Sequence, residues 1–285
     1  MSHNLSFSLE IFPPRTAKAL IALRKLIVST MPFSPEFISV TYGAGGSAAQ
    51  ASFDAIKSCT DLSDTQIIAH MTMVGQEARD VEDAQRRAHA LGADGFVLLR
   101  GDAKDGAVET AYDSMPEFIK ATRAHFECCP RYVAAYPIAH PRAASAHADL
   151  NHLKAKLDAG ATGAISQFCF EPEEFLRFRD RAAAAGITAP IRAGILPFKG
   201  LGPTEKISRL AGLDLPEWLI AGLSRAEDLD EQRLFALATA SDMIDVLARE
   251  GVEDFHIYTL NDAELTASLL GLHAKARLHL REAAA

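Results

Sequence analysis

The chain has 285 residues and a mass of 30.7 kDa, enough for one large α/β domain with a sizeable core. Apolar residues make up 48% and charged residues 23% of it, and the mean hydropathy is +0.03, which excludes disordered, fibrous and membrane-spanning proteins. The formal net charge of -8 argues against general electrostatic binding to nucleic acid or anionic lipid, so we expect a small-molecule or protein partner.

Short runs rich in Val, Ile and Phe alternate along the chain with longer, Ala-rich amphipathic segments. The apolar runs predict strands at residues 6–12, 36–42, 66–72, 94–100, 131–136, 163–169, 191–196 and 254–260. The segments between them carry apolar residues at helical spacing and predict helices that include 17–28, 78–91, 144–159 and 173–185. This alternation is typical of βα units around a parallel sheet.

Eight such units in 285 residues predict a (β/α)8 TIM barrel, with a doubly wound sheet as the alternative. Neither a linker nor a shift in composition divides the chain, so we expect residues 1–285 to form a single domain. A helical insertion is predicted at 203–223, between strands seven and eight. The KGLGP run at 199–203 predicts a mobile loop that opens this insertion.

Polar residues are concentrated at the predicted strand ends, where TIM barrels carry their chemistry. They are Glu10, Thr41, His70, Thr72, Arg100, Gly101, Asp102, Tyr136, His140, Gln167, Tyr258, Thr259 and Asn261. A purely structural barrel would need few of these side chains. The pattern therefore predicts a ligand site at the C-terminal end of the barrel.

Glu10 lies within the apolar strand SFSLEIF, so its carboxyl group either faces the barrel mouth or is buried at a cost of several kcal/mol. Desolvation would raise its pKa and keep a proton available near neutral pH, as a general acid requires. The alternative is a structural ion pair with an Arg or Lys inside the barrel.

Two short motifs have weaker implications. The GAGGSA run at 43–48 loosely matches a dinucleotide-binding fingerprint, but it follows the second strand, so a glycine loop close to a ligand is favoured. Arg100, Gly101 and Asp102 could clamp a cofactor, or could form a salt bridge around a turn. The histidines lack HExxH spacing and a companion set of carboxylates, so no metal site is predicted.

The cysteines and the N-terminal segment suggest a cytoplasmic protein. The four cysteines lack the spacing of zinc or redox motifs, so we expect reduced thiols. The N-terminal MSHNLSFSLEIFPP has neither a basic segment nor a long apolar segment, and the chain has no apolar run long enough to cross a membrane.

Over nearly its whole length the chain resembles the methylenetetrahydrofolate reductases, flavin-dependent barrel enzymes of one-carbon metabolism. The segments that carry the resemblance stand in the family's order: SLEIFPPR, FISVTYGAGG, HMT, LLRGD, AAYPIAHP, ADLNHLKAKLDAGA, ISQFCFEPEEFLRFRDRA, GILP and GVEDFHIYTLN. This resemblance alone implies FAD as cofactor, a folate substrate and NADH or NADPH as hydride donor in a ping-pong reaction. It also implies a homo-oligomer, either a dimer or a tetramer.

The resemblance also implies roles for individual residues. Glu10 would be the general acid that protonates a folate nitrogen as the methylene bridge opens, and Gln167 would contact both the nicotinamide and the folate. Asp102 would lie near the pyrimidine edge of the flavin and tune its potential. The positions expected around FAD are Thr41, His70, Arg100, Gly101, Asp102, Tyr136, His140, Asp149, His152 and Lys156.

Some positions depart from the family pattern. His152 and Ala155 replace an Asn and an Arg, and Asp262 replaces an Arg that would meet the anionic glutamate tail of folate, so the local charge is reversed. The family's folate-contacting glutamine is not found around Pro203. The alternative function is a folate-binding methyl-group transferase, or a non-redox barrel protein that lacks flavin.

Overall fold

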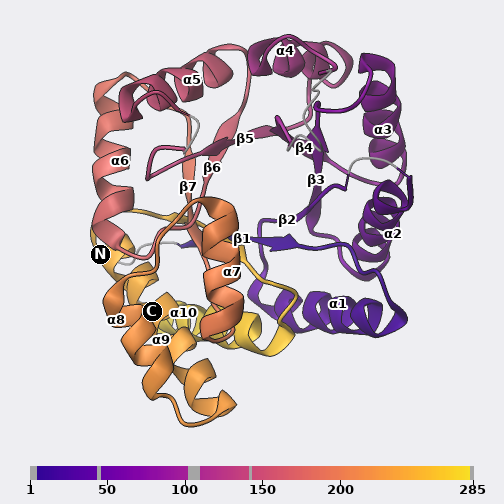
Figure 1. Cartoon of the computed structure of the whole chain (residues 1–285). Helices are drawn as coiled ribbons and strands as arrows, with labels where there is room; N and C mark the ends of the chain where they lie inside the picture. The colour runs from indigo at the N-terminus through magenta and orange to yellow at the C-terminus, as the bar shows by residue number, and fades with distance from the viewer. Residues whose placement is uncertain (1–4, 44–45, 102–109, 141–142, 283–285) are drawn as a thin grey trace.

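Eight parallel strands close into a barrel in a computed structural model that describes residues 5–43, 46–101, 110–140 and 143–282, with the side chains of 46–48 and 274–282 excepted. Each strand pairs with the next along the chain, and β8 pairs with β1 (Figure 1). The strands are β1 (Ser6–Ile11), β2 (Phe37–Val40), β3 (Gln66–Thr72), β4 (Gly95–Leu99), β5 (Arg131–Ala135), β6 (Gly163–Ser166), β7 (Ile191–Ile195) and β8 (Asp254–Tyr258). The closed sheet confirms the TIM barrel and rules out the doubly wound alternative.

Helices surround the barrel (Figure 1). They are α1 (Ala17–Thr30), η1 (Met31–Phe33), α2 (Gly46–Leu62), α3 (Ala78–Ala90), α4 (Met115–His125), α5 (Ala146–Asp158), α6 (Pro172–Ala184), α7 (Leu201–Ala211), α8 (Glu217–Arg225), α9 (Leu229–Arg249) and α10 (Ala263–Glu282). Among the described residues, no helix combines the length and apolar character needed to cross a membrane.

The alternation of side chains along each strand separates the main core from the barrel interior. On β1, Phe7, Leu9 and Ile11 belong to the large apolar cluster that the surrounding helices cover. The residues between them, Ser8 and Glu10, therefore face the inside of the barrel. A separate apolar cluster fills part of that interior: Phe37, Ile68, Val97 and Ile165. Most polar residues that face inward find a partner in the barrel or reach its mouth.

A charged cluster lies at the N-terminal ends of the strands. The guanidinium of Arg192 on β7 is 2.6 Å from a carboxylate oxygen of Glu36 and 3.5 Å from one of Asp254. It also lies over the ring of Phe37, 4.9 Å from the ring centroid. The Arg192 side chain is only 7% exposed, so these contacts compensate a buried charge at the end opposite to the predicted chemistry.

The helical insertion between β7 and β8 is confirmed, but the predicted loop at 199–203 is wrong because α7 begins at Leu201. Gly200 precedes the helix with φ +97°, and Pro203 fits the first turn, where a missing N–H breaks no helical bond. Another apolar cluster joins the insertion to α10 through Phe198, Leu219, Leu223, Ala236 and Leu265. The indole N–H of Trp218 on α8 donates to Glu171, just before α6, at 2.6 Å.

Candidate active site

A cavity of about 540 Å³ lies at the C-terminal ends of the strands. Six of the predicted site residues line it together: Glu10, Thr41, His70, Gly101, Tyr136 and Gln167. They come from β1, β3 and the segments after β2, β4, β5 and β6, so the barrel brings together positions far apart in the chain. Pockets that bind small molecules typically enclose about 300 to 1,000 Å³, so this cavity has the size of a ligand site.

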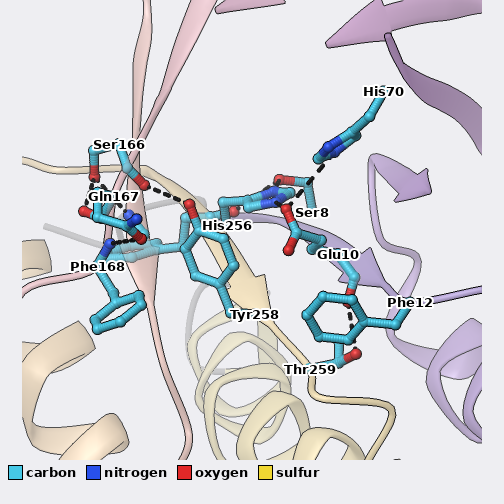
Figure 2. A network of polar contacts seen from close by, with 12 residues as sticks. Ser8, Glu10, Phe12, His70, Ser166, Gln167, Phe168, His256, Tyr258 and Thr259 are labelled. Carbon is cyan, nitrogen blue, oxygen red and sulfur yellow. Dashed lines mark hydrogen bonds and ion pairs between the residues drawn. The ribbon is translucent and has the colours of Figure 1, made fainter. Parts of the chain in front are cut away.

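Glu10 is the buried carboxylate of this cavity, with a side chain only 13% exposed. Its Oε2 atom lies 3.6 Å from His70 Nε2 and 3.9 Å from His256 Nε2 (Figure 2). Burial raises the pKa of Glu10, and the nearby His70 opposes this only in part. Within the described residues, the basic groups within 4 Å of this carboxylate are imidazoles rather than the Arg or Lys of a structural ion pair.

Both imidazoles beside Glu10 favour the neutral form. Burial lowers the pKa of His70 to about 4 and that of His256 to about 3. His70 Nε2 is buried and has no hydrogen-bond partner among the described residues. His256 Nδ1 lies 2.7 Å from the Ser8 hydroxyl oxygen. At neutral pH, Glu10 is therefore surrounded by uncharged rings, which do little to stabilise an ionised carboxylate.

The segment after β8 holds the backbone around Glu10 in place. The Thr259 hydroxyl donates to the Glu10 carbonyl oxygen at 2.6 Å (Figure 2). The Asn261 amide accepts from the Phe12 N–H at 2.9 Å and donates to the Phe12 carbonyl oxygen at 2.8 Å. Leu260 and Asn261 adopt left-handed conformations, with φ of 47° and 53°. This uncommon backbone places the Asn261 amide where it can clamp the end of β1.

The predicted Arg-Gly-Asp segment is described as far as Gly101. Gly101 has φ +84°, and a Cβ atom there would lie 2.9 Å from Thr72 Cβ, so glycine is required at this cavity wall. Arg100 has an exposed side chain, and its carbonyl oxygen accepts from the N–H groups of Met73 and Val74. Asp102 lies outside the described residues, so its roles in catalysis and flavin binding remain predictions.

A small crevice adjoins the cavity through Ala134 and Tyr136, which line both. Asp149 and Lys156 of α5 also line it, and the Lys156 ammonium donates to the Ala134 carbonyl oxygen at 2.5 Å. Burial lowers the pKa of Lys156 to about 8, against the opposing effect of Asp149. The crevice therefore holds a partly buried amine that is charged at neutral pH.

The remaining two predicted flavin residues differ in their placement. The backbone N–H of His140 donates to the Asp149 carboxylate at 3.0 Å. The His140 ring meets the Tyr136 ring edge-on at a centroid distance of 4.8 Å. His140 thus belongs to the crevice network. His152 is exposed on α5 and is absent from the described lining of both cavities.

Comparison with known proteins identifies the family. The family model for methylenetetrahydrofolate reductase matches residues 1–272. The chain belongs to the methylenetetrahydrofolate reductase family. The 5,10-methylenetetrahydrofolate reductase of Escherichia coli K12 is 36% identical over 270 residues, covering 93% of this chain and 89% of the relative. That of Pectobacterium carotovorum is 34% identical over 267 residues, with the same coverage.

Solved structures with low sequence identity share the fold. A Clostridium thermocellum protein described as binding two copies of 5-methyl-5,6,7,8-tetrahydrofolic acid superposes with a TM-score of 0.68 at 15% identity, covering 97% of this chain and 96% of that one. Dihydropteroate synthase from Stenotrophomonas maltophilia superposes with a TM-score of 0.52 at 15% identity, covering 96% and 94%. At such identities the likeness supports the barrel fold alone.

Asp262, which replaces the arginine expected from the methylenetetrahydrofolate reductase pattern, lies immediately before α10. Its carboxylate accepts from the Leu265 N–H at 3.1 Å and lies 3.5 Å from Lys199 Nζ and 3.6 Å from an Arg233 nitrogen. Burial alone would raise the pKa of Asp262, but this hydrogen bond and the two cations lower it. Asp262 is therefore an ionised helix cap, and the two basic side chains compensate the reversed charge.

Several of the residues predicted from the sequence line this cavity, but two polar residues buried next to Glu10 were not among them. Ser8 and His256 lie in the middle of β1 and β8, and neither was predicted as a site residue. Side chains two positions apart on a strand face the same side, so Ser8 and His256 could have been predicted from Glu10 and Tyr258, which follow them by two positions. Tyr258, named only as a polar strand end, lines the cavity and donates to the Ser166 carbonyl oxygen at 2.9 Å.

Proposed function

We propose that this protein is an FAD-dependent oxidoreductase that interconverts 5,10-methylenetetrahydrofolate and 5-methyltetrahydrofolate. NADH or NADPH would donate the hydride in a ping-pong reaction. Family membership supports the methylenetetrahydrofolate reductase activity. The observation that carries the proposed chemistry is a buried Glu10 carboxyl with a raised pKa, lining a cavity large enough for a ligand.

The cavity and the adjoining crevice fit FAD in three respects. Gly101 leaves the wall free of a side chain where a Cβ would collide with Thr72. His70 presents a buried nitrogen with no hydrogen-bond partner among the described residues, and Lys156 supplies a cation suited to phosphate. The residues proposed to hold the cofactor are Thr41, His70, Gly101, Tyr136, His140, Asp149 and Lys156, with Arg100, Asp102 and His152 as further candidates. FAD would accept a hydride from the nicotinamide and deliver it to the folate carbon.

Glu10 would supply the proton of the folate half-reaction. Its carboxyl proton moves to the folate nitrogen whose bond to the bridging methylene breaks, and the bridge opens to an iminium cation. The iminium carbon then accepts the hydride and becomes the methyl group, while Glu10 is left as a carboxylate. A raised pKa increases the fraction of Glu10 that carries the proton needed for this step.

Gln167 would bind both substrates in turn. Its side-chain Oε1 accepts from the Phe168 backbone N–H at 3.1 Å (Figure 2). Its backbone N–H donates to the Ala135 carbonyl oxygen at 2.8 Å. The first bond orients the side-chain amide, and the second holds the backbone of Gln167 at the cavity wall. An amide held in this way offers a polar contact to either ligand without a charge.

The proposal is tested by the visible absorption spectrum of the purified protein under anaerobic conditions. We expect a flavin spectrum that bleaches when NADH or NADPH is added and recovers when methylenetetrahydrofolate follows. A colourless protein that takes up no added FAD would refute the oxidoreductase assignment. It would favour the folate-binding methyl-group transferase or the non-redox barrel instead.

We further propose that residues 1–285 form one catalytic domain, that the protein is cytoplasmic and that it assembles as a dimer or tetramer. The described cysteines are free thiols, as expected in a reducing compartment. Sedimentation equilibrium tests the assembly, because a monomer at micromolar concentration would contradict it.

A further inference from the structure

Ser8 and His256 form a fully buried pair beneath Glu10. They are direct neighbours in the register of β1 and β8, one inward-facing position deeper than the pair Glu10 and Tyr258. Their exposed fractions are 0% and 1%. The Ser8 hydroxyl oxygen and His256 Nδ1 are 2.7 Å apart, and Figure 2 shows the pair directly beside the Glu10 carboxyl group.

The hydrogen-bond partners of Ser8 favour one tautomer of His256. A serine hydroxyl has a single proton, and the Ser8 oxygen lies 3.1 Å from the Phe255 carbonyl oxygen, which can only accept. When the Ser8 hydroxyl donates its proton to Phe255, the hydrogen bond between Ser8 and His256 must be donated by His256, with the proton on Nδ1. A neutral imidazole carries one N–H, so Nε2 then has a lone pair and no proton.

This lone pair faces Glu10. His256 Nε2 is 3.9 Å from Glu10 Oε2, and His70 Nε2 is 3.6 Å from the same oxygen. These distances are too long for hydrogen bonds, so the interaction is electrostatic, and an ionised carboxylate would be repelled by the lone pair whereas a neutral carboxyl group would not. The opposite tautomer, with a proton on Nε2, would stabilise the carboxylate instead.

We propose that Ser8 and His256 are positioning residues that keep the Glu10 carboxyl group protonated. Ser8 holds the imidazole with its proton on Nδ1, and the bare Nε2 disfavours loss of the Glu10 proton. The role assigned to Glu10 rests on the proposed function, whereas the tautomer does not.

The other titratable groups near Glu10 do not account for this effect. His70 on β3 is a neutral ring, and the Tyr258 hydroxyl on β8 is engaged with the Ser166 carbonyl oxygen. Arg15 and Tyr136 line the same cavity from the segments after β1 and β5. A positive Arg15 near Glu10 would favour the carboxylate, so it cannot be the source of a retained proton.

The first test measures the tautomer by ¹⁵N NMR of the FAD-containing protein labelled at histidine, with no folate added. The signals of His256 are assigned by their loss in His256→Asn and by their shift in Ser8→Ala. We expect a protonated Nδ1 and an unprotonated Nε2. A protonated Nε2 would overturn the proposal whatever reaction the enzyme catalyses.

The second test compares the pH dependence of the folate half-reaction in Ser8→Ala and Ser39→Ala. Ser39 is the matched control because it is equally buried and pairs with Glu10 in the β1–β2 register, yet its hydroxyl has no hydrogen-bond partner in the described part of the chain. In Ser8→Ala we expect the alkaline midpoint of the rate profile to fall by about one pH unit, so that the rate above both midpoints is about tenfold lower than in the wild type. In Ser39→Ala the midpoint should not change.

Ser8→Thr keeps the hydroxyl and should restore the wild-type midpoint. An unchanged midpoint in Ser8→Ala, or equal shifts in both alanine variants, would refute the positioning role. If Ser8→Ala does not fold, the ¹⁵N NMR measurement of the His256 tautomer in the unmodified protein tests the proposal instead. If the unmodified protein shows no folate half-reaction, the proposed function fails, and the tautomer measurement still tests the pair.

Discussion

Replacing Glu10 by glutamine separates the chemical role of this residue from its packing. Gln occupies nearly the same volume, and its uncharged amide can face the Nε2 atoms that lie 3.6 and 3.9 Å from the present carboxylate oxygen. The backbone bonds from Thr259 and Asn261 do not involve the side chain and remain. The variant should therefore fold with the cavity intact and without an ionisable proton donor.

The loss of activity follows from the missing proton. A positioned general acid contributes about 10²- to 10⁴-fold, so the folate half-reaction should slow by that factor, equivalent to about 3 to 5 kcal/mol. The assay is anaerobic stopped-flow reoxidation of the reduced enzyme by methylenetetrahydrofolate. A rate within threefold of wild type would remove Glu10 from its proposed role.

Glu10→Gln should lower the activity but raise the stability of the folded protein at neutral and alkaline pH. The pKa of Glu10 is raised above its ordinary value of 4.5, so the folded state resists ionisation and loses stability as pH rises from 4.5 through the folded pKa. Each unit of that rise corresponds to about 1.4 kcal/mol, and glutamine avoids this cost. Urea unfolding should show equal stabilities at pH 4 and a more stable Glu10→Gln protein at pH 8. A variant that is less stable at pH 8 would refute the burial argument.

Three further variants test other parts of the molecule. Lys156 has a pKa of about 8, so FAD affinity should weaken as pH rises through 8, and Lys156→Met should lose this dependence in a fluorescence titration; parallel curves would contradict it. Gly101→Ala forces an alanine to φ +84° against Thr72, so thermal unfolding should reveal a loss of at least about 1 to 2 kcal/mol, and an unchanged midpoint would count against the geometry. Burial alone would raise the pKa of Glu36, but a serine hydroxyl and Arg192 lower it. The ion pair between Glu36 and Arg192 therefore stabilises the folded state above pH 4.5, and this stabilisation is lost as the pH falls. Glu36→Gln should therefore be less stable than wild type at pH 7 and equal to it in acid, as urea unfolding would show; a difference that persists in acid would refute the ion pair.

The barrel could be predicted because its order is local in the sequence. Each apolar run and each amphipathic segment signals its own element, and eight repetitions leave few arrangements of the sheet. The error at 199–203 arose because Gly and Pro usually indicate a loop. Here Pro203 lies in the first turn of α7, where the rule against proline in helices does not apply.

Site residues at the ends of strands could be predicted from the sequence, whereas residues that meet only through the pairing of two strands could not. Glu10 and His70 stand out as polar residues at strand ends, whereas Ser8 and His256 are 248 residues apart and meet only through the register of the first and last strands. Which residues of a helix face the site is equally a tertiary property. On α5, Lys156 reaches the crevice while His152 points to solvent.

Within the insertion between β7 and β8, α8 packs into a small apolar cluster, whereas α9 also contributes Met243 and Ile244 to the main core, and this difference limits the extent of cooperative unfolding. Leu219 and Leu223 belong to the small cluster and not to the large core, so we expect α8 to open at a free energy below that of global unfolding. The amides of α8 would then exchange with deuterium ahead of those of the barrel strands. Trp218 connects this event to the segment after β6 through its bond to Glu171, so opening of the insertion breaks a contact four residues from Gln167.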